Sequence, residues 1–337
     1  MSTSAIRPDI PLLKVLNLRT HLPTERGIVH AADGVTFELK SGKTLAVVGE
    51  SGCGKSVLCR ALLGLLPKTA IIGEGSGIFY NGTNLVELSE KAYNKIRAQE
   101  IAMIFQDPLS SLNPVMTIGR QIAETLIYHK KMKPGAARRL AIDLLQSAGV
   151  PGPKQRIDQY PHQLSGGMRQ RAAIAIALAC EPKLLIADEP TTALDVTVQE
   201  GILDLLGQLQ AKRQMAMILV THDLNIAAAR AHDIAVMYAG RIVEQASAAT
   251  LFSDSCMPYT RALKNSIPRI DSPPHTPLNS INGRPPNLLR PIQGCAFAPR
   301  CSRTRELCHT DRPLLLPEPE NRRHLVACRY PLRGAAL

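Results

Sequence analysis

The stretch that decides the fold is LAVVGESGCGKSVLCRALL, residues 45–63. It begins with an apolar run typical of a buried strand, passes through a glycine-rich turn and continues with helical periodicity. The turn, GESGCGKS at 49–56, fits the pattern G-x-x-x-x-G-K-[ST] in the strand–turn–helix context that this pattern requires. The stretch therefore predicts a loop that binds the phosphates of a nucleoside triphosphate.

The residue types of this loop suit phosphate chemistry. Its three glycines let backbone N–H groups turn toward phosphate oxygens, and the helix that follows adds its positive N-terminus. Lys55 is expected to place its charge on the β and γ phosphates, and Ser56 to offer its hydroxyl to Mg²⁺. The predicted nucleotide-binding residues of the loop are Gly49, Glu50, Ser51, Gly52, Cys53, Gly54, Lys55 and Ser56.

A second stretch, LLIADEP at 184–190, supplies the acidic residues that phosphoryl chemistry needs. An apolar strand delivers Asp188 to its C-terminal end, where the carboxylate can hold Mg²⁺ through water. Glu189 follows directly and is placed to orient or deprotonate the attacking water. An acidic pair after a strand is weak evidence by itself, but together with the upstream phosphate loop it indicates a nucleotide hydrolase.

The rest of the chain alternates between apolar runs and helical patterns. This alternation predicts an α/β fold with a mostly parallel sheet that is covered by helices on both faces. The segment 107–181 is almost entirely helical and predicts an inserted helical subdomain, while YAGRIVEQ at 238–245 predicts a strand pair. The predicted strands are 45–49, 101–105, 183–188, 215–220 and 233–238, and the predicted helices are 117–130, 135–148, 166–180, 196–212 and 223–231.

Composition limits the class of protein. With 337 residues and 45% hydrophobic residues the chain can form a substantial core, yet it contains no apolar run long enough to cross a bilayer. The N-terminus lacks a signal-peptide pattern, so a cytoplasmic location is expected. Aromatic residues make up only 4% and Trp is absent, which argues against a protein that stacks on nucleic-acid bases. The net charge is +12, and the tail from Arg284 onward holds ten Arg against four acidic residues.

Further motifs give the chain a specific resemblance. LSGGMRQR at 164–171 resembles the signature motif of ATP-binding cassette (ABC) proteins, and Gln106 resembles the glutamine of their Q-loop. TTALD, ending at Asp195, resembles the D-loop, and His222 resembles the switch histidine. Because the motifs stand intact and in family order, the resemblance covers roughly residues 10–250. Taken singly, Gln106 could be a polar residue at a strand end, Asp195 a helix cap and His222 a core histidine.

The resemblance implies roles for these residues. Glu189, His222 and Gln106 would be catalytic, and Ser56, Gln106 and Asp188 would hold Mg²⁺. Ser165, Gly166 and Gly167 would complete the ATP pocket of an opposite subunit, so that two cassettes close head to tail on ATP. By position Arg26 would lie against adenine, through its guanidinium plane.

Several stretches narrow the resemblance to the peptide-importer branch of ABC ATPases. They include AMIFQDPLSSLNP at 102–114, ALDVTVQ at 193–199 and MPYTRAL at 257–263. The branch implies a fold made of a P-loop cassette with a RecA-like parallel sheet, an antiparallel β part, the inserted helical subdomain and a small cysteine-containing C-terminal extension. We place the cassette at 1–255 and the extension, with its proline-rich linker, at 256–337.

The same branch implies what the protein works with. A second, non-identical ATPase subunit, two transmembrane permease subunits and a periplasmic or lipid-anchored peptide-binding protein are the expected partners. The chain would act at the cytoplasmic face of the inner membrane and energise uptake of dipeptides or oligopeptides. Nickel and glutathione are alternative cargoes, and a soluble ABC ATPase that acts on nucleic acid is the alternative of another class.

The extension contains Cys295, Cys301, Cys308 and Cys328. Disulfides need an oxidising compartment, which the expected location does not offer. Zinc remains possible, although the close cysteine pairs typical of structural zinc sites are absent. Four thiolates can also hold a 4Fe–4S cluster, and the branch is known for such a cluster. We therefore rank the cluster first, zinc second and free thiols third. Nearby arginines, Arg300, Arg303, Arg305 and Arg329, are expected to offset its negative charge.

Overall fold

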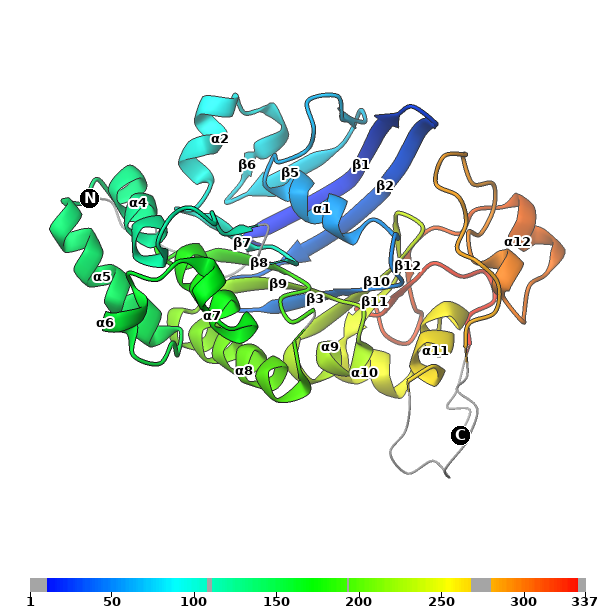
Figure 1. Ribbon diagram of the computed structural model, residues 1–337. Coiled ribbons are helices and arrows are strands. Elements are labelled where there is room, and N and C mark those ends of the chain that lie inside the picture. The colour runs from blue at the N-terminus through cyan, green and yellow to red at the C-terminus, as the bar shows by residue number, and fades with distance from the viewer. Residues whose placement is uncertain (1–10, 108–110, 193, 268–279, 333–337) are drawn as a thin grey trace. The chain divides into compact units, whose positions relative to one another are not determined.

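The structure is a computed structural model of the chain that describes residues 11–107, 111–192, 194–267 and 280–332 (Figure 1). These residues form two compact units, each built from separate stretches of the chain. One unit comprises residues 1–13, 39–44 and 80–220, and the other comprises 14–38, 45–79 and 221–337. We call them the helical unit and the loop unit, after the helical insertion and the phosphate loop that they contain.

The strands of the loop unit belong to two sheets. In one sheet the order is β12-β13-β11-β10-β3, with β10 parallel to β3 and antiparallel to β11. In the other, β1 lies between β2 and β5 and also pairs with β4. The strands are β1 (Leu13–Thr24), β2 (Gly27–Leu39), β3 (Thr44–Val48), β4 (Ile71–Ile72), β5 (Gly77–Tyr80), β10 (Asp233–Tyr238), β11 (Arg241–Ser247), β12 (Leu316–Pro317) and β13 (Leu325–Val326).

The helices of the loop unit cover these strands and carry the C-terminal extension. Their shared core contains the rings of Tyr238, Tyr259 and Phe297, and the side chains of three cysteines of the extension pack against it. The helices are α1 (Lys55–Leu62), α9 (Leu224–Arg230), α10 (Ala248–Ser253), α11 (Pro258–Asn265) and α12 (Glu306–Thr310), with a 3₁₀ turn η3 (Ala298–Arg300).

The helical unit contains three parallel strands in the order β9-β8-β7, with residues such as Ile186 of β8 paired to Met103 and Ile218. All five residues of β8 are buried, which is the pattern of a strand covered on both faces. The strands are β6 (Thr83–Asn84), β7 (Ile101–Ile104), β8 (Leu184–Asp188) and β9 (Ala216–Thr221).

The predicted helical insertion is present in this unit. Figure 1 shows α4, α5, α6 and α7 gathered into one group, and apolar side chains of α4, α5 and α7 form a separate core. The helices are α2 (Glu90–Ile96), α4 (Ile118–Lys130), α5 (Pro134–Ser147), α6 (Pro153–Arg156), α7 (Gly166–Ala177) and α8 (Val196–Arg213), with 3₁₀ turns η1 (Leu85–Glu87) and η2 (Pro161–Gln163).

Candidate functional site

The phosphate loop lies between β3 and α1, as the sequence predicts. Gly54 has φ of +106°, and a Cβ atom there would lie 2.0 Å from the carbonyl oxygen of Ala31. Only glycine fits both the backbone conformation and the space. No side chain of the described residues caps the N-terminus of α1. Helix α1 thus begins directly at the glycine-rich loop, and a helix N-terminus at such a loop is the arrangement that binds phosphate.

Lys55 lies at the centre of the loop. Its side chain is only 5% exposed, and Nζ donates hydrogen bonds to the carbonyl oxygens of Gly49 at 2.7 Å and Glu50 at 3.1 Å. A buried ammonium needs such acceptors. The loop thus wraps around the charge that is expected to meet the β and γ phosphates.

In the helical unit, the structure brings Gln106 and Glu189 together although 83 residues separate them. Gln106 Nε2 donates to Glu189 Oε2 at 3.2 Å, and Thr192 Oγ1 donates to the same oxygen at 3.0 Å. The sequence does not predict Thr192 as a site residue, although Thr192 lies in the TTALD stretch that resembles the D-loop. Two donors on one oxygen fix the orientation of the carboxylate that is expected to act on water.

The backbone at Glu189 is also constrained. Its φ is +45°, a left-handed conformation that costs a residue with a side chain roughly 1–2 kcal/mol. The N–H group of Glu189 donates to the carbonyl oxygen of Val220 at 3.0 Å. Asp188, one residue earlier at the end of β8, is 3% exposed. Such local strain beside a buried carboxylate is typical of functional sites.

The signature motif opens helix α7, as predicted. Ser165 is its N-cap and accepts a hydrogen bond from the N–H of Met168 at 3.3 Å. A Cβ atom on Gly167 would lie 2.7 Å from a methyl group of Val198, so this glycine allows α7 to pack closely on α8. Ser165 and Gly166 are exposed, which leaves this helix start accessible to another molecule.

Three remaining predicted residues have simple placements. Asp195 caps helix α8 by accepting from the N–H of Val198 at 2.9 Å, which is the ordinary interpretation of this residue. His222 is exposed and lines a hollow of about 250 Å³ together with Val48, the last residue of β3. Arg26 is exposed in the turn between β1 and β2. The loop residues, Arg26 and His222 belong to the loop unit, and the other predicted nucleotide residues belong to the helical unit.

The four cysteines of the extension line one small cavity, which Arg303 and Arg329 also border. Burial raises the pKa of Cys295, Cys301 and Cys328, the last to about 11, and the neighbouring thiols raise the pKa of each further. Among the described residues, no three of these sulfur atoms lie within 4.8 Å of one another. Sulfur ligands of one tetrahedral zinc lie about 3.8 Å apart.

The arginines around this cavity differ from expectation in one respect. Arg329 pairs with Asp311, and the guanidinium of Arg305 lies 4.2 Å from the ring centre of Tyr330. Arg300, expected to offset the charge of a cluster, instead forms an ion pair with Glu50 of the phosphate loop. The charge of Arg300 is therefore balanced by Glu50 and not by the cysteines.

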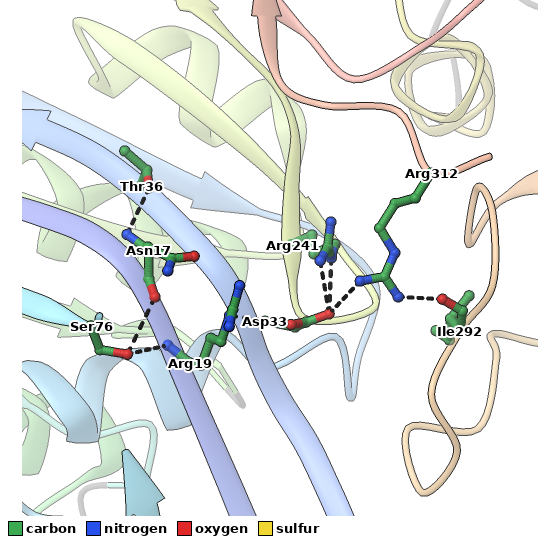
Figure 2. Close-up of polar contacts among 8 residues, drawn as sticks. All are labelled: Asn17, Arg19, Asp33, Thr36, Ser76, Arg241, Ile292 and Arg312. Carbon is green, nitrogen blue, oxygen red and sulfur yellow. Dashed lines mark hydrogen bonds and ion pairs between the residues drawn. The ribbon is translucent and has the colours of Figure 1, made fainter. Parts of the chain in front are cut away.

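A larger cavity, of about 780 Å³, also lies in the loop unit. It is bordered by β1, β2, the β10–β11 hairpin and the extension. Figure 2 shows Asp33 in this region with Arg241 and Arg312 turned toward its carboxylate, at 2.9 and 3.1 Å. The composition predicts a basic tail, but it does not predict that Asp33 pairs with an arginine of that tail.

Residues 32–192 match the family model of the ABC transporter, and residues 243–308 match that of the oligopeptide/dipeptide transporter C-terminal region. A probable peptide ABC transporter ATP-binding protein of Sinorhizobium fredii is 48% identical over 90% of this chain and 91% of its own length. The dipeptide transport ATP-binding protein DppD of Bacillus subtilis is 47% identical over 88% of each chain.

Solved structures agree with these matches. A dimeric ATP-binding cassette in a post-hydrolysis state, bound to ADP and phosphate, is 28% identical and has a TM-score of 0.63. The match covers 70% of this chain and 98% of that cassette.

These matches define the class of protein as an ABC ATPase, and they confirm the cassette part of the predicted fold class. The chain belongs to the ABC family, in the group of peptide transport ATP-binding proteins. In the part of the chain that the structure describes, none of the helices is long and apolar enough to cross a membrane.

Proposed function

We propose that this chain is the ATP-hydrolysing subunit of an importer that takes up dipeptides or oligopeptides. The observation that carries the proposal is the oriented carboxylate of Glu189, held by Gln106 and Thr192, in a chain that also has an intact phosphate loop. The C-terminal region, which matches that of oligopeptide and dipeptide transporters, supports a peptide as the cargo.

In the proposed reaction, the phosphate loop holds ATP and Lys55 neutralises charge on the β and γ phosphates. Glu189 accepts a proton from the attacking water, and His222 and Gln106 assist. Ser56, Asp188 and Gln106 are the residues assigned to Mg²⁺, which would neutralise the phosphate charge that develops during hydrolysis. The proposal that all these residues act at one ATP molecule is based on the order of the family motifs in the sequence. The assignment of Arg26 to adenine has the same basis.

The first test is hydrolysis by the complete transporter. We expect Glu189→Gln to retain ATP binding but to lower turnover at least about 100-fold, because the general base is lost. Glu181→Gln, which changes an exposed glutamate paired with Lys130, is the matched control and is expected to keep normal turnover. Undiminished hydrolysis by Glu189→Gln would show that another group is the base.

The second test identifies the cargo. Cells with the intact transporter and cells with Lys55→Ala would be supplied with a labelled dipeptide, with longer peptides, glutathione and nickel as competitors. We expect uptake to collapse in the variant and only peptides to compete. If dipeptide uptake persists, the cargo is another compound, and the one whose uptake the variant loses identifies it.

We also propose the partners. Two permease subunits in the membrane and a peptide-binding protein deliver the cargo, and this chain acts peripherally at the cytoplasmic face of the membrane. A second, non-identical ATPase subunit would use the exposed start of α7 at Ser165 and Gly166. Mass measurement of the purified transporter tests this, because two copies of this chain in one complex would indicate a homodimer.

Finally, we propose that the four cysteines hold a 4Fe–4S cluster, which would stabilise the fold of the extension by linking its separate segments. The support is the shared cavity and the flanking arginines. The purified transporter should contain about four iron and four sulfide per chain, and Cys308→Ser should lose them while Cys180→Ser should not. If the protein instead contains one zinc per chain, the cysteines form a zinc site. If it contains no metal, the cysteines are free thiols.

A further inference from the structure

The segment between two cysteines of the extension reaches the phosphate loop. Arg300 directly precedes Cys301, and its side chain is only 3% exposed. Its guanidinium binds Glu50 through two parallel hydrogen bonds, Nη1 to Oε2 at 2.6 Å and Nη2 to Oε1 at 2.9 Å. This bidentate geometry is the strongest and most directional form of an arginine–carboxylate contact.

The guanidinium has further acceptors. Nη1 also donates to the hydroxyl of Tyr238 at 3.2 Å, Nε to the carbonyl oxygen of Asn282 at 2.9 Å and Nη2 to that of Ile281 at 3.1 Å. The hydrogen bonds that Arg300 donates to the Glu50 carboxylate keep the pKa of Arg300 above its usual value. A buried, fully hydrogen-bonded guanidinium has little freedom, so Arg300 fixes the position of the carboxylate that it holds.

A second contact holds the backbone of the same loop residue. The N–H of Glu50 donates to the hydroxyl of Tyr259 at 3.0 Å. Tyr259 lies on α11 and is fully buried, with its ring centre 4.4 Å from that of Tyr238 and 5.2 Å from that of Phe297. Phe297 follows Cys295 by two residues. Both the side chain and the backbone of Glu50 are therefore held by residues that follow the cassette core.

The position of Glu50 affects the lysine of the loop. The carbonyl oxygen of Glu50 is one of the two loop acceptors for Lys55 Nζ, at 3.1 Å. A displacement of Glu50 would change the backbone around this ammonium. Phosphate binding by such loops depends on how well the backbone and the lysine are placed beforehand.

We infer that Arg300 is a positioning residue for the phosphate loop and that, through Glu50, it makes nucleotide affinity depend on the intact four-cysteine segment. The inference rests on the proposed function, because it assumes that the loop binds ATP. A displacement of the cysteines would reach the loop through the six residues from Cys295 to Arg300.

The first experiment separates KM from kcat in the purified transporter. Arg300→Met should raise the KM for ATP about tenfold, while kcat stays within about twofold. Arg300→Lys should show a similarly raised KM, because lysine cannot form the two parallel hydrogen bonds of arginine. Glu50→Gln should have a similar effect, and the double variant should be no worse than either alone. Arg312→Met removes an arginine of the same extension that pairs with Asp33 instead, and should leave KM unchanged.

An unchanged KM in Arg300→Met would overturn the inference. An equal rise in Arg312→Met would also overturn it, because the effect would then follow from general weakening of the extension. Lys55→Ala is the separate check on the proposed function. If that variant binds a fluorescent ATP analogue as well as the wild type does, the proposed nucleotide site is wrong, whatever Arg300 does.

The second experiment tests the coupling without using turnover. Binding of the fluorescent ATP analogue would be measured for Cys308→Ser, for Arg300→Met and for the double variant. A separate Lys55→Ala protein would give the level of non-specific binding. We expect about tenfold weaker binding for each single variant and no further loss in the double variant. Normal binding by Cys308→Ser, or losses that multiply in the double variant, would show that the cysteines do not act through Arg300.

Discussion

At the scale of single residues, Asp33 shows how one side chain joins distant parts of the loop unit. It lies on β2 and pairs with Arg19 of β1, Arg241 of β11 and Arg312 of the extension (Figure 2). Burial opposes ionisation of this carboxyl, but Arg241 and the other two arginines outweigh it and hold the pKa of Asp33 below its usual value. Its ionised form therefore stabilises the folded state.

This gives a prediction with a defined pH dependence. Asp33→Asn should lower the free energy of unfolding by about 1–3 kcal/mol at pH 7, because the arginines lose a charged acceptor. The stabilisation is complete above the unfolded pKa of about 3.8 and is lost as the pH falls through the lower folded value. Denaturant titrations at several pH values should show the difference between variant and wild type shrinking below about pH 4.

The matched control is Asp158→Asn. Asp158 also has two hydrogen bonds from an arginine, Arg138, but both partners are more than half exposed. Exposed pairs contribute little because water and salt screen them. If this variant loses as much stability as Asp33→Asn, burial is not what makes the Asp33 network important.

At the scale of elements, the helical insertion shows why a helix can require a glycine. The N–H of Gly119 in the first turn of α4 donates to the carbonyl oxygen of Ile157 at 2.8 Å. A Cβ atom on Gly119 would lie 2.1 Å from Cγ1 of Ile157 and 2.7 Å from its carbonyl oxygen. Helix α4 can therefore approach the chain after α6 only because no side chain is present there.

We expect Gly119→Ala to destabilise the helical unit by about 1–3 kcal/mol, because overpacking forces the backbone to shift. Gly207→Ala in the middle of α8 is the control, since nothing lies within 4 Å of a Cβ atom there. That change should be neutral or stabilising by about 0.5–1 kcal/mol, the usual helical preference for alanine. Equal shifts of the denaturation midpoint in the two variants would contradict this account.

At the scale of the whole molecule, the attachment of the C-terminal extension is decided by a buried polar pair. Strand β13 joins the edge of β11, with Val326 opposite Glu244. At this junction His324 Nε2 and Glu244 Oε1 lie 2.7 Å apart, and the two side chains are 2% and 0% exposed. The N–H of Cys256 donates to the same carboxylate oxygen at 2.6 Å.

His324→Ala should therefore loosen the extension as a whole. A buried carboxylate that loses a partner costs about 1–3 kcal/mol or more. Hydrogen exchange at Val326 and Ala327 should become faster, and ATP affinity should fall if the extension acts on the phosphate loop. His309→Ala is the control, because His309 is exposed and its ring lies against the hydroxyl of Thr304, away from the buried pair. Unchanged exchange in His324→Ala would show that strand pairing alone holds the extension.

The amino-acid sequence by itself determined the elements of the phosphate-loop core and of the helical insertion, although it did not predict the long strands β1 and β2. The helix predicted at 117–130 is observed at Ile118–Lys130, and the strand predicted at 233–238 is observed at Asp233–Tyr238. Such elements follow from local periodicity and from glycine requirements, which neighbouring residues decide. The domain boundary near residue 255 stays a prediction, because the compact units combine separate stretches of the chain.

Only the tertiary structure decided which charged groups meet. Gln106 meets Glu189 across 83 positions, and Arg300 meets Glu50 across 250. Charge composition assigned Arg300 to the cysteines, yet its guanidinium binds the phosphate loop. Cysteine spacing likewise gives no three-dimensional arrangement, whereas the folded chain brings all four cysteines of the extension to one small cavity. The physical reason is that a side chain's partner depends on the path of the folded backbone, which no local pattern contains.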